Sequence, residues 1–182
     1  MDNYREEIVV KKNRMANNIL YALLCVVMVL SGLMAAMSLS SIGTVLSEGG
    51  GLVSSILWTV FSGGIAFLIW WKKDVLRLEY EYTFTNGELD FACVFGNKKR
   101  KALGSMRVKN VEACGLVQSG SFQRYLKMPN VKTTNWFLNR DANLLFFFFQ
   151  KDGNKRIIVM EPTDEMTEMI KKYLPRGAFQ VN

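Results

Sequence analysis

The chain has 182 residues, 49% of them hydrophobic, and its 23 Lys and Arg exceed its 16 Asp and Glu to give a formal net charge of +7. It contains no histidine, which excludes Ser-His-Asp and Cys-His nucleophile systems and every histidine-ligated metal site. Asp, Glu, Lys and Arg are also absent from two long stretches, 15–47 and 49–71. Soluble domains rarely contain such stretches, so the sequence indicates a membrane protein.

Residues 19–71 are expected to form a transmembrane hairpin that follows a cytoplasmic N-terminal segment, 1–18. A helix needs roughly 20 mostly apolar residues to cross the hydrocarbon core, and 19–40 and 52–71 each meet this length. The glycine-rich link 47–51 between them suits a tight reversal. The alternative is a cleaved signal peptide, but its apolar region is only about 7–15 residues long.

Cations flank both predicted spans: Lys11, Lys12 and Arg14 before the first, and Lys72, Lys73 and Arg77 after the second. The link between the spans carries only Glu48. Because cytoplasmic flanks are enriched in Lys and Arg, we expect both termini to be cytoplasmic and the protein to reside in the cell membrane (plasma or inner).

The end of the second span resembles a membrane–water interface. Trp70 and Trp71 precede Lys72 and Lys73, which predicts an aromatic belt with lysines extending toward the head groups. Neither span contains Asp, Glu, Lys or Arg. Because ionisable groups inside the membrane usually mark ion or substrate pathways, this argues against a pump or channel.

The three cysteines, Cys25, Cys93 and Cys114, lack CxxC spacing. In a cytoplasmic domain we expect them to be reduced and structural. A zinc site has too few ligands, so no metal and no cofactor is predicted.

Residues 75–182 are predicted to form a cytoplasmic domain that begins with an antiparallel meander. Between Leu76 and Thr85 apolar and polar residues alternate, the pattern of a half-buried strand. The dipeptide Asn86-Gly87 is a strong hairpin signal, and a return strand over 88–95 leads to a second turn. One or two further strands are expected through Leu116.

The second half of the domain begins with a long connection, 118–143, that has room for a short strand or helix. Strands over 143–150 and 155–161 follow, with a hairpin turn between them. Thr163 is a candidate N-cap of a helix whose apolar face is Met166, Met169, Ile170, Tyr173 and Leu174. The expected fold is a membrane-anchored α+β protein whose antiparallel barrel or sandwich is closed by this C-terminal helix.

Several segments of the domain resemble a known family. The runs YTFTNGELDF, SMRVKNVEACGLV and EPTDEMTEMIKKYLP, with a basic turn after the first, are similar to bacterial pleckstrin-homology-like (PH-like) domains found beside membrane helices. Together with the N-terminal hairpin, nearly the whole chain resembles a family of bacterial membrane proteins with this layout. The resemblance implies a PH-like β-barrel or sandwich and brings no catalytic residues.

The sharpest electrostatic feature is the basic cluster Lys98, Lys99, Arg100 and Lys101. In eukaryotic relatives of the fold, cations in an early loop bind phosphoinositide head groups, so the resemblance makes these residues candidates for anionic-lipid contact. Each cation near an anionic surface contributes on the order of 1 kcal/mol. The alternative is a solvated basic turn that only reinforces the topology.

A second candidate surface is the face formed by Leu144, Phe146 and Phe148, because the run 144–149 is apolar on both faces of its strand. In an antiparallel sheet the second face requires a cover. The cover is either the connection 118–143, with Trp136 and Phe137, or else a partner, a second copy or the membrane surface.

No motif supports catalysis or nucleic-acid binding. Phosphate-binding glycine loops of the GxxxxGKS or GxGxxG type are absent. Glu88 and Asp90 share a strand face but have no partner that suggests acid/base work, and no recognition motif accompanies the basic aromatic segments. We therefore expect a non-catalytic binding or scaffolding protein whose domain recruits a protein partner or a second copy. Anionic-lipid contact and an accessory subunit of a membrane complex are the alternatives.

Overall fold

The computed structural model describes residues 3–48 and 51–180. The chain divides into two compact units. One unit comprises residues 13–77, the helical hairpin, and the other combines residues 1–12 with residues 78–182. Residues 1–12 are therefore part of the domain, whereas the sequence predicts a separate N-terminal segment, 1–18.

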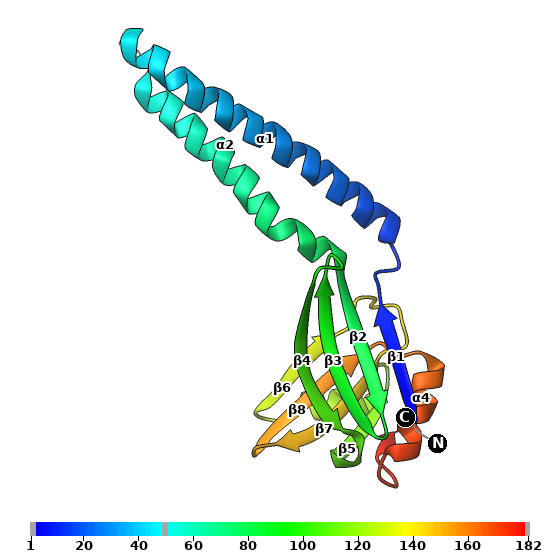
Figure 1. Ribbon diagram of the computed structural model, residues 1–182. Helices are drawn as coiled ribbons and strands as arrows, with labels where there is room; N and C mark the ends of the chain where they lie inside the picture. The colour runs from blue at the N-terminus through cyan, green and yellow to red at the C-terminus, as the bar shows by residue number, and fades with distance from the viewer. Residues whose placement is uncertain (1–2, 49–50, 181–182) are drawn as a thin grey trace. The chain divides into compact units, whose positions relative to one another are not determined.

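The hairpin unit consists of α1 (Arg14–Glu48), α2 (Leu52–Lys72) and a short 3-10 helix (Lys73–Arg77), and Figure 1 shows α1 and α2 side by side. Both long helices are apolar enough to cross a membrane. With 35 residues, α1 is longer than the predicted span 19–40 and reaches about 52 Å at 1.5 Å per residue. The predicted start of the domain at Val75 falls in the 3-10 helix, and the first strand after it begins at Leu78.

Polar contacts and close packing connect the two helices. The Ser38 hydroxyl donates a hydrogen bond of 3.1 Å to the Ser55 carbonyl oxygen, and the Thr59 hydroxyl donates one of 2.9 Å to Ser38. A Cβ at Gly63 would lie 3.8 Å from Ala35. Of the predicted link 47–51, Ser47 belongs to α1 and Gly51 has a φ of 70°, while Gly49 and Gly50 lie outside the described residues.

The domain contains two sheets. The first has the order β1-β2-β3-β4 and consists of β1 (Tyr4–Val9), β2 (Leu78–Thr85), β3 (Glu88–Phe95) and β4 (Lys99–Arg107). The second has the order β6-β8-β7-β5-β9 and consists of β5 (Val111–Leu116), β6 (Val131–Trp136), β7 (Leu145–Lys151), β8 (Asn154–Met160) and β9 (Phe179–Gln180). The helices α3 (Gly120–Leu126) and α4 (Asp164–Tyr173) complete it. The described strands form no closed barrel, so the fold is an open sandwich with a helix.

Strand β1 was not anticipated. It pairs antiparallel with β2 in six residue pairs, from Tyr4 opposite Thr85 to Val9 opposite Tyr80. The side chains that β1 turns toward the core include charged Arg5 and Glu7, so the segment lacks the alternation that identified β2. The pairing joins residues on either side of the hairpin into one sheet (Figure 1).

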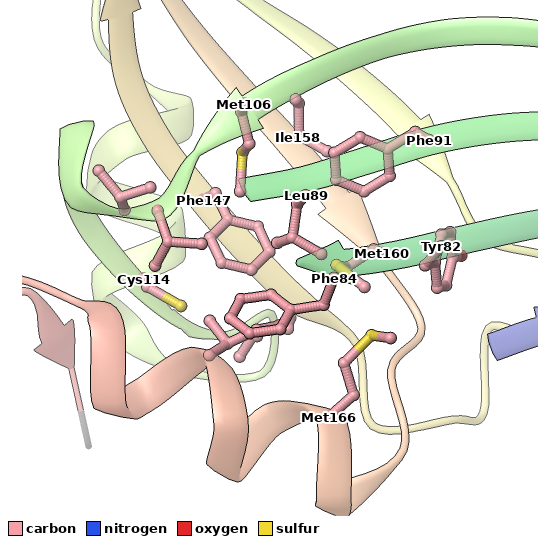
Figure 2. Packing of buried hydrophobic residues seen from close by; sticks show 14 of the residues in the cluster. Tyr82, Phe84, Leu89, Phe91, Met106, Cys114, Phe147, Ile158, Met160 and Met166 are labelled. Atoms are coloured by element: carbon pink, nitrogen blue, oxygen red, sulfur yellow. The ribbon is translucent and has the colours of Figure 1, made fainter. Parts of the chain in front are cut away.

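The main core lies between the two sheets and α4. Fully buried side chains from β2 and β3, such as Tyr82, Phe84 and Leu89, meet Phe147 of β7 and Met166 of α4 (Figure 2). Burial of such side chains contributes about 1.5–3 kcal/mol each. α4 therefore closes the sandwich, as the sequence predicts.

The turns and the helix cap follow the sequence signals. Asn86 and Gly87 both have positive φ, 47° and 90°, as the hairpin turn between β2 and β3 requires. The hydroxyl of Thr163 accepts a hydrogen bond of 3.3 Å from the backbone N–H of Met166 and so caps α4. The connection 118–143 contains both α3 and β6.

Candidate functional site

The basic cluster is exposed but does not converge on one site. Lys98 lies in the β3–β4 turn, and Lys99, Arg100 and Lys101 begin β4, an edge strand of its sheet. Neighbouring side chains of a strand point to opposite faces. Arg100 therefore points to one face of the sheet, and Lys99 and Lys101 to the other.

Arg100 is already paired. Its Nε lies 2.5 Å from the Glu81 carboxylate, and the pair spans β3, because Glu81 is opposite Ala92 and Arg100 is opposite Val94. Ala92 is only 5% exposed although it lies on the outer face. Its small side chain leaves room for the ion pair to cross the sheet.

The cluster has a structural explanation that needs no ligand. Edge strands expose unpaired N–H and C=O groups, and charged side chains, lysine above all, reduce edge-to-edge aggregation. Lys99 and Lys101 are exposed on such an edge. Electrostatic protection of β4 therefore accounts for their presence.

The β3–β4 turn nevertheless lies at a distinctive end of its sheet. Phe95, at the end of β3, pairs with Leu78, the first residue of β2, and Tyr80 pairs with Val9, the last residue of β1. Leu78 directly follows the 3-10 helix, and Val9 shortly precedes α1. The turn thus lies at the sheet end through which both connections to the hairpin pass.

The predicted partner surface is wrong, because Leu144, Phe146 and Phe148 are 8%, 0% and 3% exposed. They form a second apolar cluster on the face of the five-stranded second sheet that points away from the main core. Helix α3 covers them: the Phe122 ring lies 5.3 Å from Phe146, and the Tyr125 ring stacks on Phe148 at 4.6 Å.

The cover is the segment 118–143, as the alternative interpretation held. Phe137 belongs to this second cluster. Trp136 faces the other way, with its ring centroid 4.6 Å from that of Phe91 in the main core. The second sheet is thus buried on both faces.

A buried polar network that no sequence pattern indicates holds the segment just before α1. Asn139 is 7% exposed; its side-chain amide donates to the Val10 carbonyl oxygen at 3.0 Å and to Glu161 at 2.7 Å, and its oxygen accepts from the Lys12 N–H at 2.8 Å. The second Glu161 oxygen accepts from the N–H groups of Leu138 and Asn139. We call Asn139, Glu161, Val10 and Lys12 the N-terminal anchor.

An ion pair at the surface extends the anchor. Lys12 Nζ lies 2.6 Å from an Asp141 carboxylate oxygen, and its hydrogen bond lowers the pKa of Asp141. Both side chains are mostly exposed, so the pair adds little stability but keeps Lys12 close to the domain.

A second contact joins β1 to α4. The carboxylate of Glu7, which is 8% exposed, accepts hydrogen bonds from the Thr163 N–H at 3.0 Å and from the Thr163 hydroxyl. The Arg5 Nε lies 2.7 Å from an oxygen of the Glu7 carboxylate and neutralises its charge, and the Arg5 guanidinium also pairs with Glu165. A carboxylate at a helix N-terminus is favourable, so β1 helps to stabilise α4.

The residues of the predicted interface belt lie at the end of α2 and the start of the 3-10 helix. Trp70 and Trp71 are 60% and 62% exposed, and Lys72 Nζ lies 4.8 Å from the Trp71 ring centroid. Lys73 turns instead to α1, where its Nζ donates to the Tyr21 hydroxyl at 3.2 Å, and the Arg77 guanidinium lies 3.8 Å above the Tyr21 ring.

The cysteines are free thiols. Cys93 and Cys114 are buried, and burial raises the pKa of both thiols. In residues 3–48 and 51–180 no three His, Cys, Asp or Glu side chains gather in a way that suits a metal ion.

Comparison with protein families identifies the family of this chain. The family described as "Bacterial PH-like domain (DUF6106)" matches residues 1–180. No curated protein and no solved structure matches the chain. The family match covers β1, both long helices and the sandwich, and it confirms the resemblance drawn from the sequence: the chain belongs to this bacterial PH-like family.

Proposed function

We propose that this protein is a non-catalytic, membrane-anchored binding or scaffolding protein whose PH-like domain recruits a protein partner at the cytoplasmic face of the cell membrane. The pairing of β1 with β2 carries the proposal. These strands directly flank the hairpin in sequence and are neighbours in one sheet. The domain is therefore held at both ends of the hairpin, as suits an anchored platform.

The membrane part of the proposal rests on the surface of the helices. Most of their large apolar side chains are exposed, for example Val26, Leu33, Val60 and Phe67, and water would solvate such a surface poorly. The cations before α1 and at the end of α2 favour a cytoplasmic location for both ends. Protease treatment of sealed membrane vesicles tests this: the domain should be cleaved only from the cytoplasmic side.

The recruitment part is tested by isolating the full-length protein from gently solubilised membranes. We expect a stoichiometric protein partner that is lost in Phe146→Ser, which disrupts the domain core, and retained in Leu126→Ser, an exposed position on α3. A partner retained by both variants would bind the hairpin and favour an accessory-subunit role. Absence of any partner from the wild-type protein would contradict the proposal.

Anionic-lipid contact through Lys98, Lys99 and Lys101 is the second candidate. Its support is the location of the β3–β4 turn at the sheet end through which the chain enters from the 3-10 helix. Native mass spectrometry of the full-length protein can count bound anionic lipids. Replacing the three lysines by Ser should remove them. The matched control is Ser at three other exposed cations: Arg107, which ends β4, Lys109, which follows it, and Lys151, which ends β7 and lines the same hollow as Arg107.

A further inference from the structure

The edge of β5 is occupied by a very short strand, β9. Phe179 pairs with Cys114 and Gln180 with Gly115, parallel to β5. The Cys114 N–H donates a hydrogen bond of 2.8 Å to the carbonyl oxygen of Ala178. A segment that follows α4 thus completes the sheet next to that helix.

Few contacts hold this strand in the part of the chain that the structure describes. It forms two residue pairs with β5 there, against six between β1 and β2. Phe179 is only partly buried against the main core, and Lys171 Nζ lies 4.5 Å from its ring centroid. Segments with few buried contacts open at low free-energy cost, so β9 is among the most easily displaced strands.

Gly115 fits β5 to accept a neighbouring strand at close range. A Cβ at this position would lie 2.8 Å from the backbone oxygen of Gln180 and 3.2 Å from a ring carbon of Phe146. A glycine inside a strand often marks the close approach of another backbone. Here the approaching backbone is that of β9.

An open hollow of about 290 Å³ adjoins β9. Leu116 and Leu145 supply apolar lining, and Asp164 and Glu168 of α4 supply carboxylates. Lys171 pairs with Glu168 at 2.7 Å. The edge therefore offers backbone hydrogen-bonding groups, an apolar position now filled by Phe179, and a net negative rim.

We propose that the β5 edge is a strand-acceptor site, which β9 fills in the resting protein and an extended peptide segment of the partner protein fills on recruitment. The segment would run parallel to β5, with an aromatic side chain in the place of Phe179 and a basic residue beside Asp164 and Glu168. In strand addition, main-chain hydrogen bonds provide affinity and side-chain pockets provide specificity. This inference rests on the proposed recruitment function and names its site.

The need to displace β9 first lowers the observed affinity of the β5 edge for a peptide. A site that is open in only a fraction of molecules binds with an apparent affinity reduced by that fraction. Removing β9 should therefore strengthen peptide binding without any new contact.

The test uses a labelled synthetic peptide of residues 176–182, RGAFQVN, because this sequence already fits the site. Its binding by fluorescence anisotropy is compared between the full-length protein and a chain ending at Gly177, both in detergent micelles. We expect at least ~10-fold tighter binding to the shortened chain. Phe→Ser in the peptide, or Gly115→Ala in the shortened chain, should abolish it.

Several outcomes would overturn the inference. They are equal binding to both chains, no binding to a shortened chain whose circular dichroism is native, and binding that persists with Gly115→Ala. If the shortened chain fails to fold, full-length Gln180→Pro replaces it, because proline lacks the N–H of Gln180 and so weakens the pairing of β9. A wild-type dimer that dissociates on loss of β9 would instead indicate strand exchange between copies.

Different results would refute the β5-edge site and the recruitment of a partner. If the partner isolated with the wild-type protein is retained by a natively folded Gly115→Ala variant, recruitment stands but does not use the β5 edge. If no partner is isolated with the wild-type protein, recruitment itself fails, whatever the peptide does.

Discussion

The side-chain nitrogen of Asn139 donates a hydrogen bond of 3.0 Å to the carbonyl oxygen of Val10, 129 residues earlier in the chain. Val10 lies between β1 and α1, so this contact fixes the approach to the first helix on the domain itself. Glu161 orients the amide from the other side at 2.7 Å. The N-terminal segment is therefore tethered twice, by its pairing with β2 and by the anchor.

Asn139→Leu should destabilise the domain by about 2–3 kcal/mol. The substitution leaves the Val10 oxygen and the Lys12 N–H without their partner. A buried polar group left unpaired costs about 1–3 kcal/mol, and the lower end applies to each of these two groups because both hydrogen bonds are only partly buried. Urea unfolding of the full-length protein in detergent, followed by near-ultraviolet circular dichroism, measures the change. Asn135→Leu, at an exposed position on β6, should change stability by less than about 0.5 kcal/mol, and equal effects of the two variants would contradict the role of the anchor.

The domain should require β1 in order to fold. Residues 78–182 alone lack Glu7, which binds Thr163, and Val9, which belongs to the main core. A chain in which a Gly/Ser linker replaces residues 14–77 keeps β1 and should be soluble with a cooperative thermal transition. Residues 78–182 alone should lack that transition, and the prediction is wrong if the two chains melt alike.

The sequence was sufficient to predict elements with a regular pattern and a local turn signal. The alternation of β2, the Asn86-Gly87 turn and the Thr163 cap each depend on neighbouring residues, and each is found in the structure. Strand β1 was missed because charged Arg5 and Glu7 occupy its inward positions. Besides each other, these side chains bind Thr163 and Glu165, which lie more than 150 residues away, so no local pattern marks the strand.

The candidate sites show the same contrast between local sequence signals and long-range packing. The sequence showed that the strand containing Phe146 needs a cover on its second face, but the choice between α3 and a partner depends on tertiary packing. Likewise, the sequence located the basic cluster but not the Arg100–Glu81 pair, which depends on the register of β3 and β4. Long-range register, rather than composition, decides which charges are free.

Tyr82 should remain neutral when exposed tyrosines ionise. Burial raises its pKa above the usual value of about 10, and its hydroxyl donates to the Trp136 carbonyl oxygen. Because the folded pKa is raised, the unfolded state loses its proton first, and stability falls as the pH rises above about 10. The pKa values of Tyr4 and Tyr80 are raised as well, but Tyr82 has the largest shift. Absorbance titration at 295 nm should therefore lose its latest-ionising tyrosine in Tyr82→Phe.

Tyr82→Phe should also lower stability at neutral pH, by about 1–3 kcal/mol, because it leaves the Trp136 carbonyl oxygen without this donor. Tyr4→Phe is the control, because Tyr4 is 58% exposed and its hydroxyl donates only to Glu6. If Tyr82→Phe instead lost amplitude near pH 10 and kept the latest-ionising tyrosine, Tyr82 would not have the raised pKa.

Phe146→Ser distinguishes a buried cover from a partner surface. The Phe146 ring is fully buried between β7 and α3, and truncating a buried Phe costs about 3–5 kcal/mol, a large part of a typical domain stability of 5–15 kcal/mol. We expect loss of the cooperative urea transition or a clear fall in its midpoint, together with rapid proteolysis. Leu126→Ser, also on the α3 side but 42% exposed, should leave both nearly unchanged. If Phe146→Ser were as stable as the wild-type protein, α3 would not pack on this face, and the face would again be available to a partner.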